Sequence, residues 1–359
     1  METEPLRRLN EAERAQLGAW GLSAAAPGSA PSIAPSKNRT VLCDGPGGGR
    51  VLVKLATGYG QRGVHREGRI LGALEEVAVP PLRLPRRAGY SAELGMLAVE
   101  WVDGAPTVFH HHRSTGRYDQ ALAERLGLAL GALHARTHRS PGRFDPADGF
   151  TEHLDLLESL LRPRPEFYAR QPRAVLQLIS RLQQDGAAMR SLQALSEAQL
   201  DRAAGCLVHG DCKQGNVLLA GAGLDEPVLI DWELAFWGDG ARDLGWLSAE
   251  YAAGWLAPEH ESEMLSQPEL QRFLAALLAA YACEREAGAY PVPPDLHERV
   301  VRWCGLALLV MAYAEAHLVR VLENRGRRLS DFGQYLLVKP EDWRPRLFGE
   351  AEGSAGGGG

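Results

Sequence analysis

The sequence predicts an α+β protein with two lobes: a small N-terminal lobe with an antiparallel sheet and a larger, mainly helical C-terminal lobe. Three observations predict this class. Strand-like apolar runs lie within the first hundred residues, helical periodicity dominates after residue 118, and one short hairpin pattern interrupts the helices at residues 206–231. With 359 residues, the chain is long enough to build two hydrophobic cores.

The chain divides into four expected segments. Residues 1–34 supply an N-terminal helix and loop, 35–102 the small lobe, 103–349 the helical lobe, and 350–359 a flexible glycine-rich tail. The expected helix spans residues 5–20, where Leu6, Leu9, Leu17 and Trp20 share one side. Glu13 falls within the same stripe, so the amphipathic pattern is interrupted there.

Strands are expected at residues 39–43, 50–55 and 96–102, with loops or a short strand over 78–94. The glycine-rich run 44–49 joins the first two strands and predicts a hairpin turn, because such clusters mark turns far more often than binding sites. Asp103 and Gly104 follow the third strand, which suits a hinge between lobes. There an adenine could meet backbone groups from Glu100 to Val102.

Helices are expected in most of the remaining chain. Their predicted ranges are 61–77, 119–137, 151–161, 173–203, 243–255, 268–287 and 295–324. The run His110–His112 is interpreted as a surface loop, because three adjacent side chains cannot easily converge on one metal ion.

Net charge, apolar runs and cysteine spacing argue against several classes of protein. The net charge of −6 argues against a nucleic-acid partner. The first residues lack the pattern of a signal peptide, and the apolar run 303–319 is interrupted by Glu315 and His317, so we expect a core helix and no membrane partner. Five cysteines without a Cys-x-x-Cys pair indicate free thiols in a reducing cytoplasm.

The stretch 206–231 has the residues that phosphoryl transfer requires. Asp211 lies five positions before Asn216, and the apolar run 228–230 leads to Asp231. In such chemistry one aspartate receives or orients the proton of the acceptor hydroxyl, while an asparagine and a second aspartate hold Mg²⁺ against nucleotide phosphates. The sequence therefore predicts a site that uses ATP and Mg²⁺.

Lysine is rare in this chain, with four residues among 39 basic ones, and two of the four lie beside this chemistry. Lys54 ends a strand of buried character, and Glu67 can face it from the helix over 61–77, which is the arrangement that grips α- and β-phosphates. An exposed surface pair is the alternative. Lys213 follows Asp211 by two residues and could neutralise the transferring phosphate, or it could face solvent.

Together, the motifs His209-Gly210-Asp211 with Asn216, Ile230-Asp231-Trp232 and the run 238–244 resemble the aminoglycoside phosphotransferase and choline kinase-like family. Lys54, Glu67 and the helix end at 133–135 extend the resemblance over residues 35–325. It implies a protein kinase-like fold in which Asp211 is the catalytic base, Asn216 and Asp231 bind Mg²⁺, and Lys54 with Glu67 clamps the phosphates. It further implies that Asp243 braces the catalytic loop and that His209 is structural. The loop over the nucleotide would be residues 35–39, including Asn38, and it lacks the usual glycines.

Three functions follow from these patterns. The first is an ATP-dependent kinase for a hydroxyl of a small molecule, such as an aminoglycoside-like compound or another metabolite. The second is a kinase for Ser/Thr hydroxyls in a peptide, which Lys213 favours. The third is a pseudokinase that binds a nucleotide or a partner without turnover, which the complete residue set disfavours. Acidic residues at 250, 259, 261 and 263 could suit a polycation and arginines at 320, 325, 327 and 328 an acidic peptide, although solvated helix faces explain both.

Overall fold

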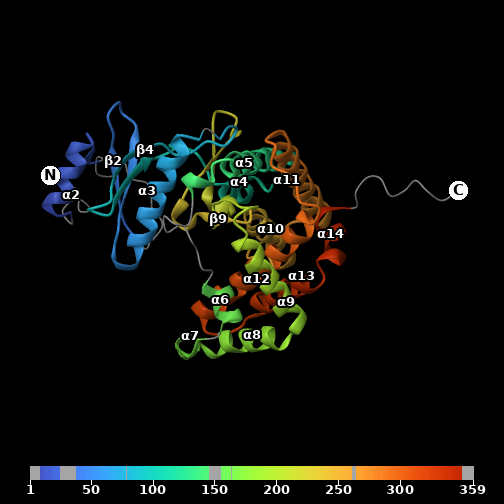
Figure 1. Cartoon of the computed structure of the whole chain (residues 1–359). Helices are drawn as coiled ribbons and strands as arrows, with labels where there is room; N and C mark the ends of the chain where they lie inside the picture. The colour runs from blue at the N-terminus through green and yellow to red at the C-terminus, as the bar shows by residue number, and fades with distance from the viewer. Residues whose placement is uncertain are drawn as a thin grey trace.

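The computed structural model places an antiparallel sheet at one end of the molecule and a helical body at the other (Figure 1). It describes residues 9–24, 38–77, 79–144, 155–162, 164–260 and 264–349. The sheet has the strand order β1-β2-β3-β5-β4, with every neighbouring pair antiparallel. Its strands are β1 (Ser23–Ala24), β2 (Arg39–Asp44), β3 (Arg50–Leu55), β4 (Arg87–Ser91) and β5 (Met96–Glu100). The predicted α+β class is confirmed.

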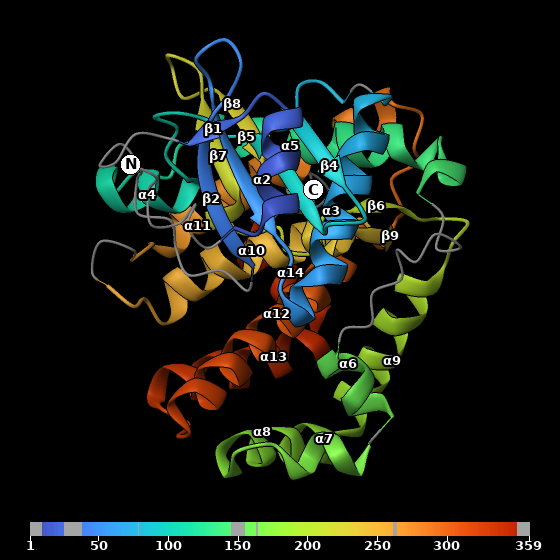
Figure 2. The same cartoon turned by 90° about the vertical axis from the view of Figure 1, so that its left-hand side faces the viewer.

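Alternation along the strands decides which side chains face each side of the sheet. Val51, Val53 and Leu55 of β3 pack in one apolar cluster with Leu17 of α2 (Glu11–Ala19). Figure 2 shows α2 in front of the strands on this face. The even-numbered residues of β3 therefore face the opposite side, where α3 (Gln61–Glu75) packs. This geometry directs Lys54 toward α3.

The start of α2 explains why Glu13 interrupts the apolar stripe. Asn10 caps the helix by accepting the Glu13 N–H at 2.8 Å, and the Glu13 carboxylate accepts the Asn10 N–H at 2.8 Å. This reciprocal arrangement is a capping box, which satisfies two backbone donors at once. The described helix therefore begins at Glu11. The beginning of the predicted range, residues 5–8, lies outside the described residues.

The helical body contains the remaining helices and two small hairpins. The helices are α4 (Val108–Thr115), α5 (Gln120–His138), α6 (Asp155–Leu161), α7 (Pro165–Ala169), α8 (Arg173–Gln184), α9 (Gly186–Leu200), α10 (Ala241–Leu256), α11 (Gln267–Ala287), α12 (Leu296–Val319), α13 (Asn324–Val338) and α14 (Pro340–Phe348). In the hairpins, β6 (Cys206–Val208) pairs with β9 (Phe236–Gly238), and β7 (Val217–Ala220) pairs with β8 (Glu226–Leu229).

Three expectations were wrong. The histidine run lies in α4 and not in a loop, and His112 is buried, with ring contacts to the Arg117 carbonyl and the Tyr251 hydroxyl. The single helix expected over 173–203 breaks at Asp185, whose carboxylate caps α9 by accepting the N–H groups of Ala187 and Ala188. The helix expected to end at residue 324 ends at Val319, and two unpredicted helices, α13 and α14, follow it.

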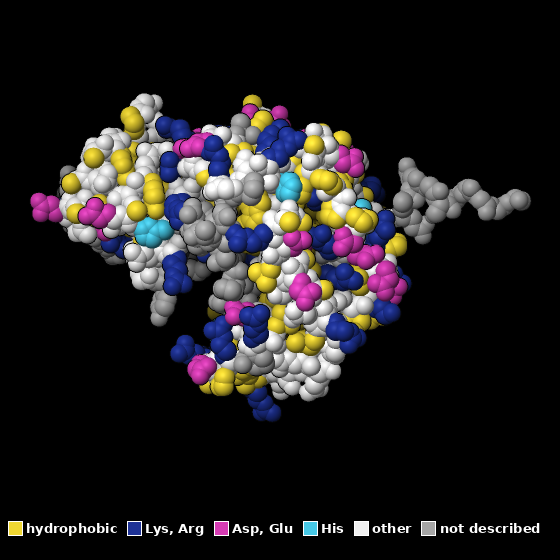
Figure 3. All heavy atoms as spheres, in the orientation of Figure 1, with side chains coloured by type: hydrophobic (Ala, Val, Ile, Leu, Met, Phe, Trp, Pro, Cys, Tyr) yellow, Lys and Arg dark blue, Asp and Glu magenta, His cyan; other side chains and the backbone are white. Residues whose placement is uncertain are grey.

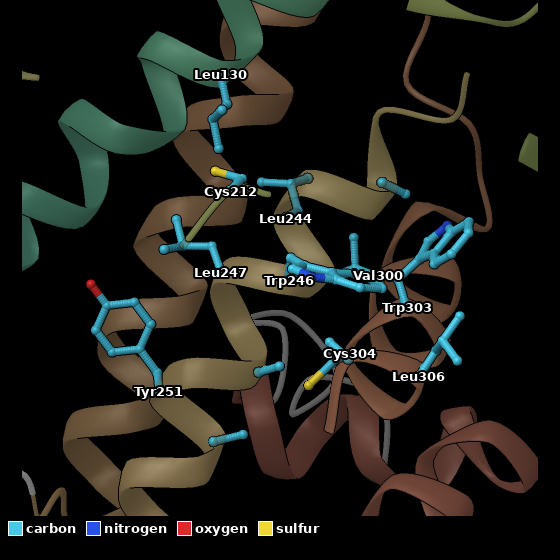
Figure 4. Packing of buried hydrophobic residues seen from close by; sticks show 14 of the residues in the cluster. Leu130, Cys212, Leu244, Trp246, Leu247, Tyr251, Val300, Trp303, Cys304 and Leu306 are labelled. Atoms are coloured by element: carbon cyan, nitrogen blue, oxygen red, sulfur yellow. The ribbon is translucent and has the colours of Figure 1, made fainter. Parts of the chain in front are cut away.

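Helix α10 lies at the centre of the body, where it packs against α12 and α11. Figure 4 shows Leu244, Trp246 and Leu247 of α10 among side chains from α5, α12 and the loop that carries Cys212. By length and composition, α12 is the one helix in the described part of the chain that could cross a membrane, but 61% of its apolar window is buried inside the protein. Helix α12 therefore belongs to the core of the protein, as the interrupted apolar run predicts.

The surface carries mixed charge. On the face shown in Figure 3, Lys and Arg side chains are interspersed with Asp and Glu.

We predict that Gly245→Ala destabilises the protein, because a Cβ at this position of α10 would lie 2.3 Å from the Cβ of Trp303 and 2.8 Å from the Cys304 nitrogen. Overpacking of a core costs about 1–3 kcal/mol, which a thermal melt would register as a Tm lower by roughly 5 °C. Gly18→Ala in α2 is the matched control, because nothing lies within 4 Å of its added Cβ. An equal Tm for both variants would contradict the close α10–α12 contact.

Candidate active site

The loop between β6 and β7 brings three of the predicted site residues together. The Asp211 Oδ2 accepts a hydrogen bond from Lys213 Nζ at 2.6 Å and another from Asn216 Nδ2 at 2.9 Å. Asn216 Nδ2 also donates to the Asp211 carbonyl at 2.9 Å. The Asp211 side chain remains 22% exposed, so it can reach a molecule in solvent. Lys213 contacts the predicted base directly and does not simply point into solvent.

Both ring nitrogens of His209 contact backbone groups of this loop and of the residue before Asp231. Its Nε2 lies 2.9 Å from the Ile230 carbonyl, and its Nδ1 accepts the Asp211 N–H at 3.3 Å. Burial lowers the pKa of His209, so the ring is neutral, and these contacts place its proton on Nε2. Both nitrogens of the His209 ring are therefore occupied by contacts within the protein.

Residues of α10 anchor the first half of the loop. The buried Asp243 carboxylate accepts the His209 N–H at 2.7 Å and the Gly210 N–H at 3.0 Å, and it lies 3.2 Å from His134 Nε2. Burial alone would raise the pKa of Asp243, but the hydrogen bond from His134 lowers it below its ordinary value. Arg242 donates to the Gly210 carbonyl at 3.2 Å. Sequence reasoning found Asp243 but missed Arg242, whose burial among aromatic rings has no local sequence signal.

Lys54 joins the two lobes. Its Nζ donates to Glu67 Oε2 at 2.6 Å and to Asp231 Oδ1 at 2.7 Å, across sequence separations of 13 and 177 residues. Burial opposes the charge on Lys54, but the two carboxylates raise its pKa above the ordinary value. Burial also opposes the charge on Asp231, yet Lys54 keeps its pKa below the ordinary value. Both groups are therefore ionised at neutral pH.

Asp231 has an unusual backbone conformation. Its φ of 69° and ψ of 60° lie in the left-handed region, just before the short 3₁₀ helix Trp232–Leu234. Non-glycine residues adopt this region uncommonly, and aspartate is among those that tolerate it best. The turn allows the side chain of Asp231 to leave the β8 side of the hairpin and reach Lys54. Placing this carboxylate therefore costs free energy in the backbone conformation of Asp231.

The hinge predicted at residues 100–102 borders a pocket between the lobes. Glu100, Trp101 and Val102 line one side of it, and Leu219 and Leu224 line the other. The Glu100 carboxylate accepts from Arg83 at 2.5 Å and from the Arg86 N–H at 3.1 Å, so its side chain supports the wall of the pocket. The hinge residues and the hairpin of β7 and β8 thus line one pocket.

The loop that would cover a nucleotide is only partly described. Asn38 is buried, and a Cβ added at Gly60 would lie 1.9 Å from its Oδ1, so the amide packs against the start of α3. Residues 35–37, which complete the predicted loop, lie outside the described residues. The glycine-rich run closes the β2–β3 hairpin through a 2.7 Å hydrogen bond from the Gly45 N–H to the Gly49 carbonyl. The predicted hairpin turn is confirmed.

A second pocket adjoins the other end of the catalytic loop. It is bordered by Gln214 of the loop, Phe109 of α4, and Glu250 of α10, with Glu259 and Arg325 beyond them. The Glu250 carboxylate accepts the Gln214 N–H at 2.5 Å. Of the acidic cluster noted in the sequence, Glu250 and Glu259 reach this pocket, whereas residues 261 and 263 lie outside the described residues. Arg325 pairs with Glu259 at 3.0 Å and with Glu315 at 2.8 Å.

The donor set fits Mg²⁺ that is shared with a nucleotide. No group of three His, Cys, Asp or Glu side chains in the described ranges could hold a metal ion by itself. Asn216 directs its Nδ2 toward Asp211, so its Oδ1 remains the atom for a cation, and Asp231 adds a second oxygen ligand. Mg²⁺ prefers this pattern, with few protein oxygens and the remaining ligands from water and phosphates.

The comparisons with known proteins decide the family. A model of the phosphotransferase enzyme family matches residues 34–292. The chain belongs to this family. A search of curated protein sequences finds no match. The resemblance inferred from the motifs is therefore confirmed, and the protein is a phosphotransferase of the kind that acts on hydroxyl groups.

Solved structures share the fold at low sequence identity. A candidate aminoglycoside phosphotransferase from Ralstonia eutropha JMP134 is 14% identical, with a TM-score of 0.58 over 94% of this chain and 98% of the other. Amicoumacin kinase, solved in complex with AMP-PNP, Ca²⁺ and Ami, is 13% identical, with a TM-score of 0.56 over 94% and 96%. Macrolide 2′-phosphotransferase from Brachybacterium faecium is 15% identical, with a TM-score of 0.52 over 91% and 98%. The predicted kinase-like fold is confirmed.

Proposed function

We propose that the protein transfers the γ-phosphate of ATP to a hydroxyl group of a small molecule, with Asp211 as the catalytic base. The observation that carries the proposal is that six residues from both lobes form two contact groups, which the Ile230 N–H joins by donating to the Asn216 carbonyl at 3.0 Å. Asp211, Lys213 and Asn216 form one contact group, and Lys54, Glu67 and Asp231 form the other. The amicoumacin kinase structure holds an ATP analogue and an antibiotic together, which supports a nucleotide and a small-molecule acceptor for this fold.

Asp211 would act on the proton of the acceptor hydroxyl. Its Oδ1, the oxygen that neither Lys213 nor Asn216 contacts, would receive that proton as the acceptor oxygen forms a bond to the γ-phosphorus. The bond between that phosphorus and the β–γ bridging oxygen breaks, and ADP leaves with the electron pair. Lys213 Nζ, at 2.6 Å from Asp211 Oδ2, is close enough to offset negative charge that develops on the transferred group.

Lys54, held by Glu67, would bind the α- and β-phosphates, and the hinge pocket at Glu100–Val102 would hold the adenine. Asn38 would contribute to the covering loop. Asn216 and Asp231 would hold Mg²⁺, which when bound supplies charge neutralisation between the β- and γ-phosphates. In the ligand-free protein Lys54 contacts Asp231 directly, so this ion pair must loosen when the phosphates bind. Glu67 stays as the buried carboxylate beside Lys54 when this happens.

The acceptor would bind in the pocket beside Gln214, because this pocket starts three residues after Asp211 in the same loop. Its border combines the aromatic ring of Phe109 with the carboxylates of Glu250 and Glu259 and the guanidinium groups of Arg113 and Arg325. This mixture suits a hydroxylated molecule that carries both apolar surface and polar groups. A peptide acceptor has no comparable support, because the relatives described above are named for aminoglycosides, macrolides and amicoumacin.

A screen of ATP consumption with Mg²⁺ tests the proposal. Aminoglycosides, macrolides, small amino alcohols and Ser/Thr peptides serve as separate arms. We expect stimulation in a small-molecule arm and a product that is heavier by one phosphate in mass spectrometry. Stimulation by peptides alone would replace the small-molecule acceptor with a peptide. If no acceptor stimulates the reaction and ATP does not bind, the protein is a pseudokinase and the proposal is wrong.

A further inference from the structure

The catalytic loop is held at two points by a single helix. Asp243 and Glu250 lie seven residues apart on α10, which corresponds to two turns and therefore to one face of the helix. Asp243 accepts the N–H groups of His209 and Gly210, before the predicted base. Glu250 accepts the N–H of Gln214, after it. The segment that carries Asp211 and Lys213 runs between these two attachments.

We propose that Glu250 is a positioning residue, which fixes the second half of the catalytic loop through the Gln214 N–H. This inference rests on the proposed function, because the loop matters for catalysis only if Asp211 acts as the base. Gln214 N–H has no helix or strand partner of its own, since it lies at the start of a single 3₁₀ turn, Gln214–Asn216. The Glu250 carboxylate supplies the missing acceptor.

The consequence for the reacting groups is geometric. Asn216, two residues after Gln214, donates to both the carbonyl and the carboxylate of Asp211. If Gln214 moves, Asn216 moves with it, and the orientation of Asp211 changes. A displacement of about 1 Å at a catalytic group can cost a hundredfold in rate. Glu250 therefore acts on Asp211 through Gln214 and Asn216, without touching the proton itself.

The surroundings of Glu250 differ from those of Glu259, the other carboxylate of the same pocket. Burial raises the pKa of Glu250 to about 7, opposed by the Gln214 N–H. Several titratable groups face it from the elements packed around it. They are Asp211, Cys212 and Lys213 of the loop, His112 and Arg113 of α4, Tyr251 of α10, and Tyr118, Glu259 and Arg325 around the pocket. Glu259 shares the pocket, but its side chain is 58% exposed and pairs with Arg325. Glu259 thus provides a matched control of equal charge.

Hydrogen exchange of the full chain without ligands tests the attachment. We expect Glu250→Ala to speed exchange of the Gln214 amide about tenfold or more, the effect of losing a charge-assisted hydrogen bond. Glu250→Gln retains an acceptor oxygen and should exchange at a rate between those of wild type and Glu250→Ala. Glu259→Ala should match wild type. The α12 amides and the Tm report whether each variant is folded.

Three results would overturn the proposal: unchanged exchange in Glu250→Ala, equal exchange in Glu250→Gln and Glu250→Ala, or faster exchange in Glu259→Ala. Because exchange needs no acceptor, it separates this proposal from the proposed function. Once an acceptor is found, kcat should fall about tenfold or more in Glu250→Ala with KM for ATP nearly unchanged. In wild type kcat should decline as the pH falls through about 7, where Glu250 is protonated, and Glu250→Gln should lack this decline.

Discussion

Asp211→Asn is expected to lower kcat by about a thousandfold, the range found when a general base is removed. Asparagine has nearly the same size and can still contact Asn216 and Lys213, but it cannot accept the hydroxyl proton. Binding of ATP should change little, because Lys54 and the hinge pocket lie apart from this side chain. Steady-state kinetics with the acceptor from the screen measures kcat, and a fluorescent nucleotide analogue measures Kd.

A substitution at an exposed aspartate is the matched control for this experiment. Asp342→Asn changes the same chemical group at an exposed position of α14 and should leave kcat and Tm at wild-type values. Lys213→Ala should lower kcat by a smaller factor, because it removes a neighbouring charge and not the base. If Asp211→Asn retains more than a tenth of the wild-type turnover, Asp211 is not the base.

The pairs of residues that the sequence predicts correctly are those that local periodicity controls. Lys54 faces α3 because the odd-numbered residues of β3 face α2. Glu67 reaches Lys54 because helical spacing places it on the inner side of α3. Asp231 follows a hairpin strand and arrives beside the loop with Asn216 for the same reason. The strand period of β3, the helical period of α3 and the hairpin of β7 and β8 are enough to predict these contacts.

The contacts that the sequence did not predict depend on how whole helices pack. The contact of Arg242 with Gly210 and that of Glu250 with Gln214 join positions 32 and 36 residues apart, and both require α10 to present one face to the loop. Close packing at Gly245 against Trp303 sets that orientation. His112 was misplaced for a similar reason, since its burial depends on Tyr251 of α10. Local patterns contain no information about these packings.

Asp231→Asn should abolish the effect of Mg²⁺ on nucleotide binding and lower turnover at least a hundredfold. A carboxylate is a much better ligand for a hard cation than an amide, and Asp231 is one of two protein ligands in the proposed site. Its pKa is held below the ordinary value by Lys54, so the wild-type residue is ionised throughout the neutral range. Titration of ATP binding with and without Mg²⁺ measures the difference directly.

Asp231→Asn should also change how Lys54 binds phosphates. In the ligand-free protein Lys54 divides its hydrogen bonds between Glu67 and Asp231, and removing the second carboxylate frees the ammonium group for phosphates. Binding of ATP without Mg²⁺ should therefore be retained or strengthened in Asp231→Asn, while turnover is lost. Asp225→Asn, in the exposed turn between β7 and β8, should alter neither quantity. A variant that lost metal-free ATP binding along with turnover would show that Asp231 supports the Lys54 clamp and is not primarily a metal ligand.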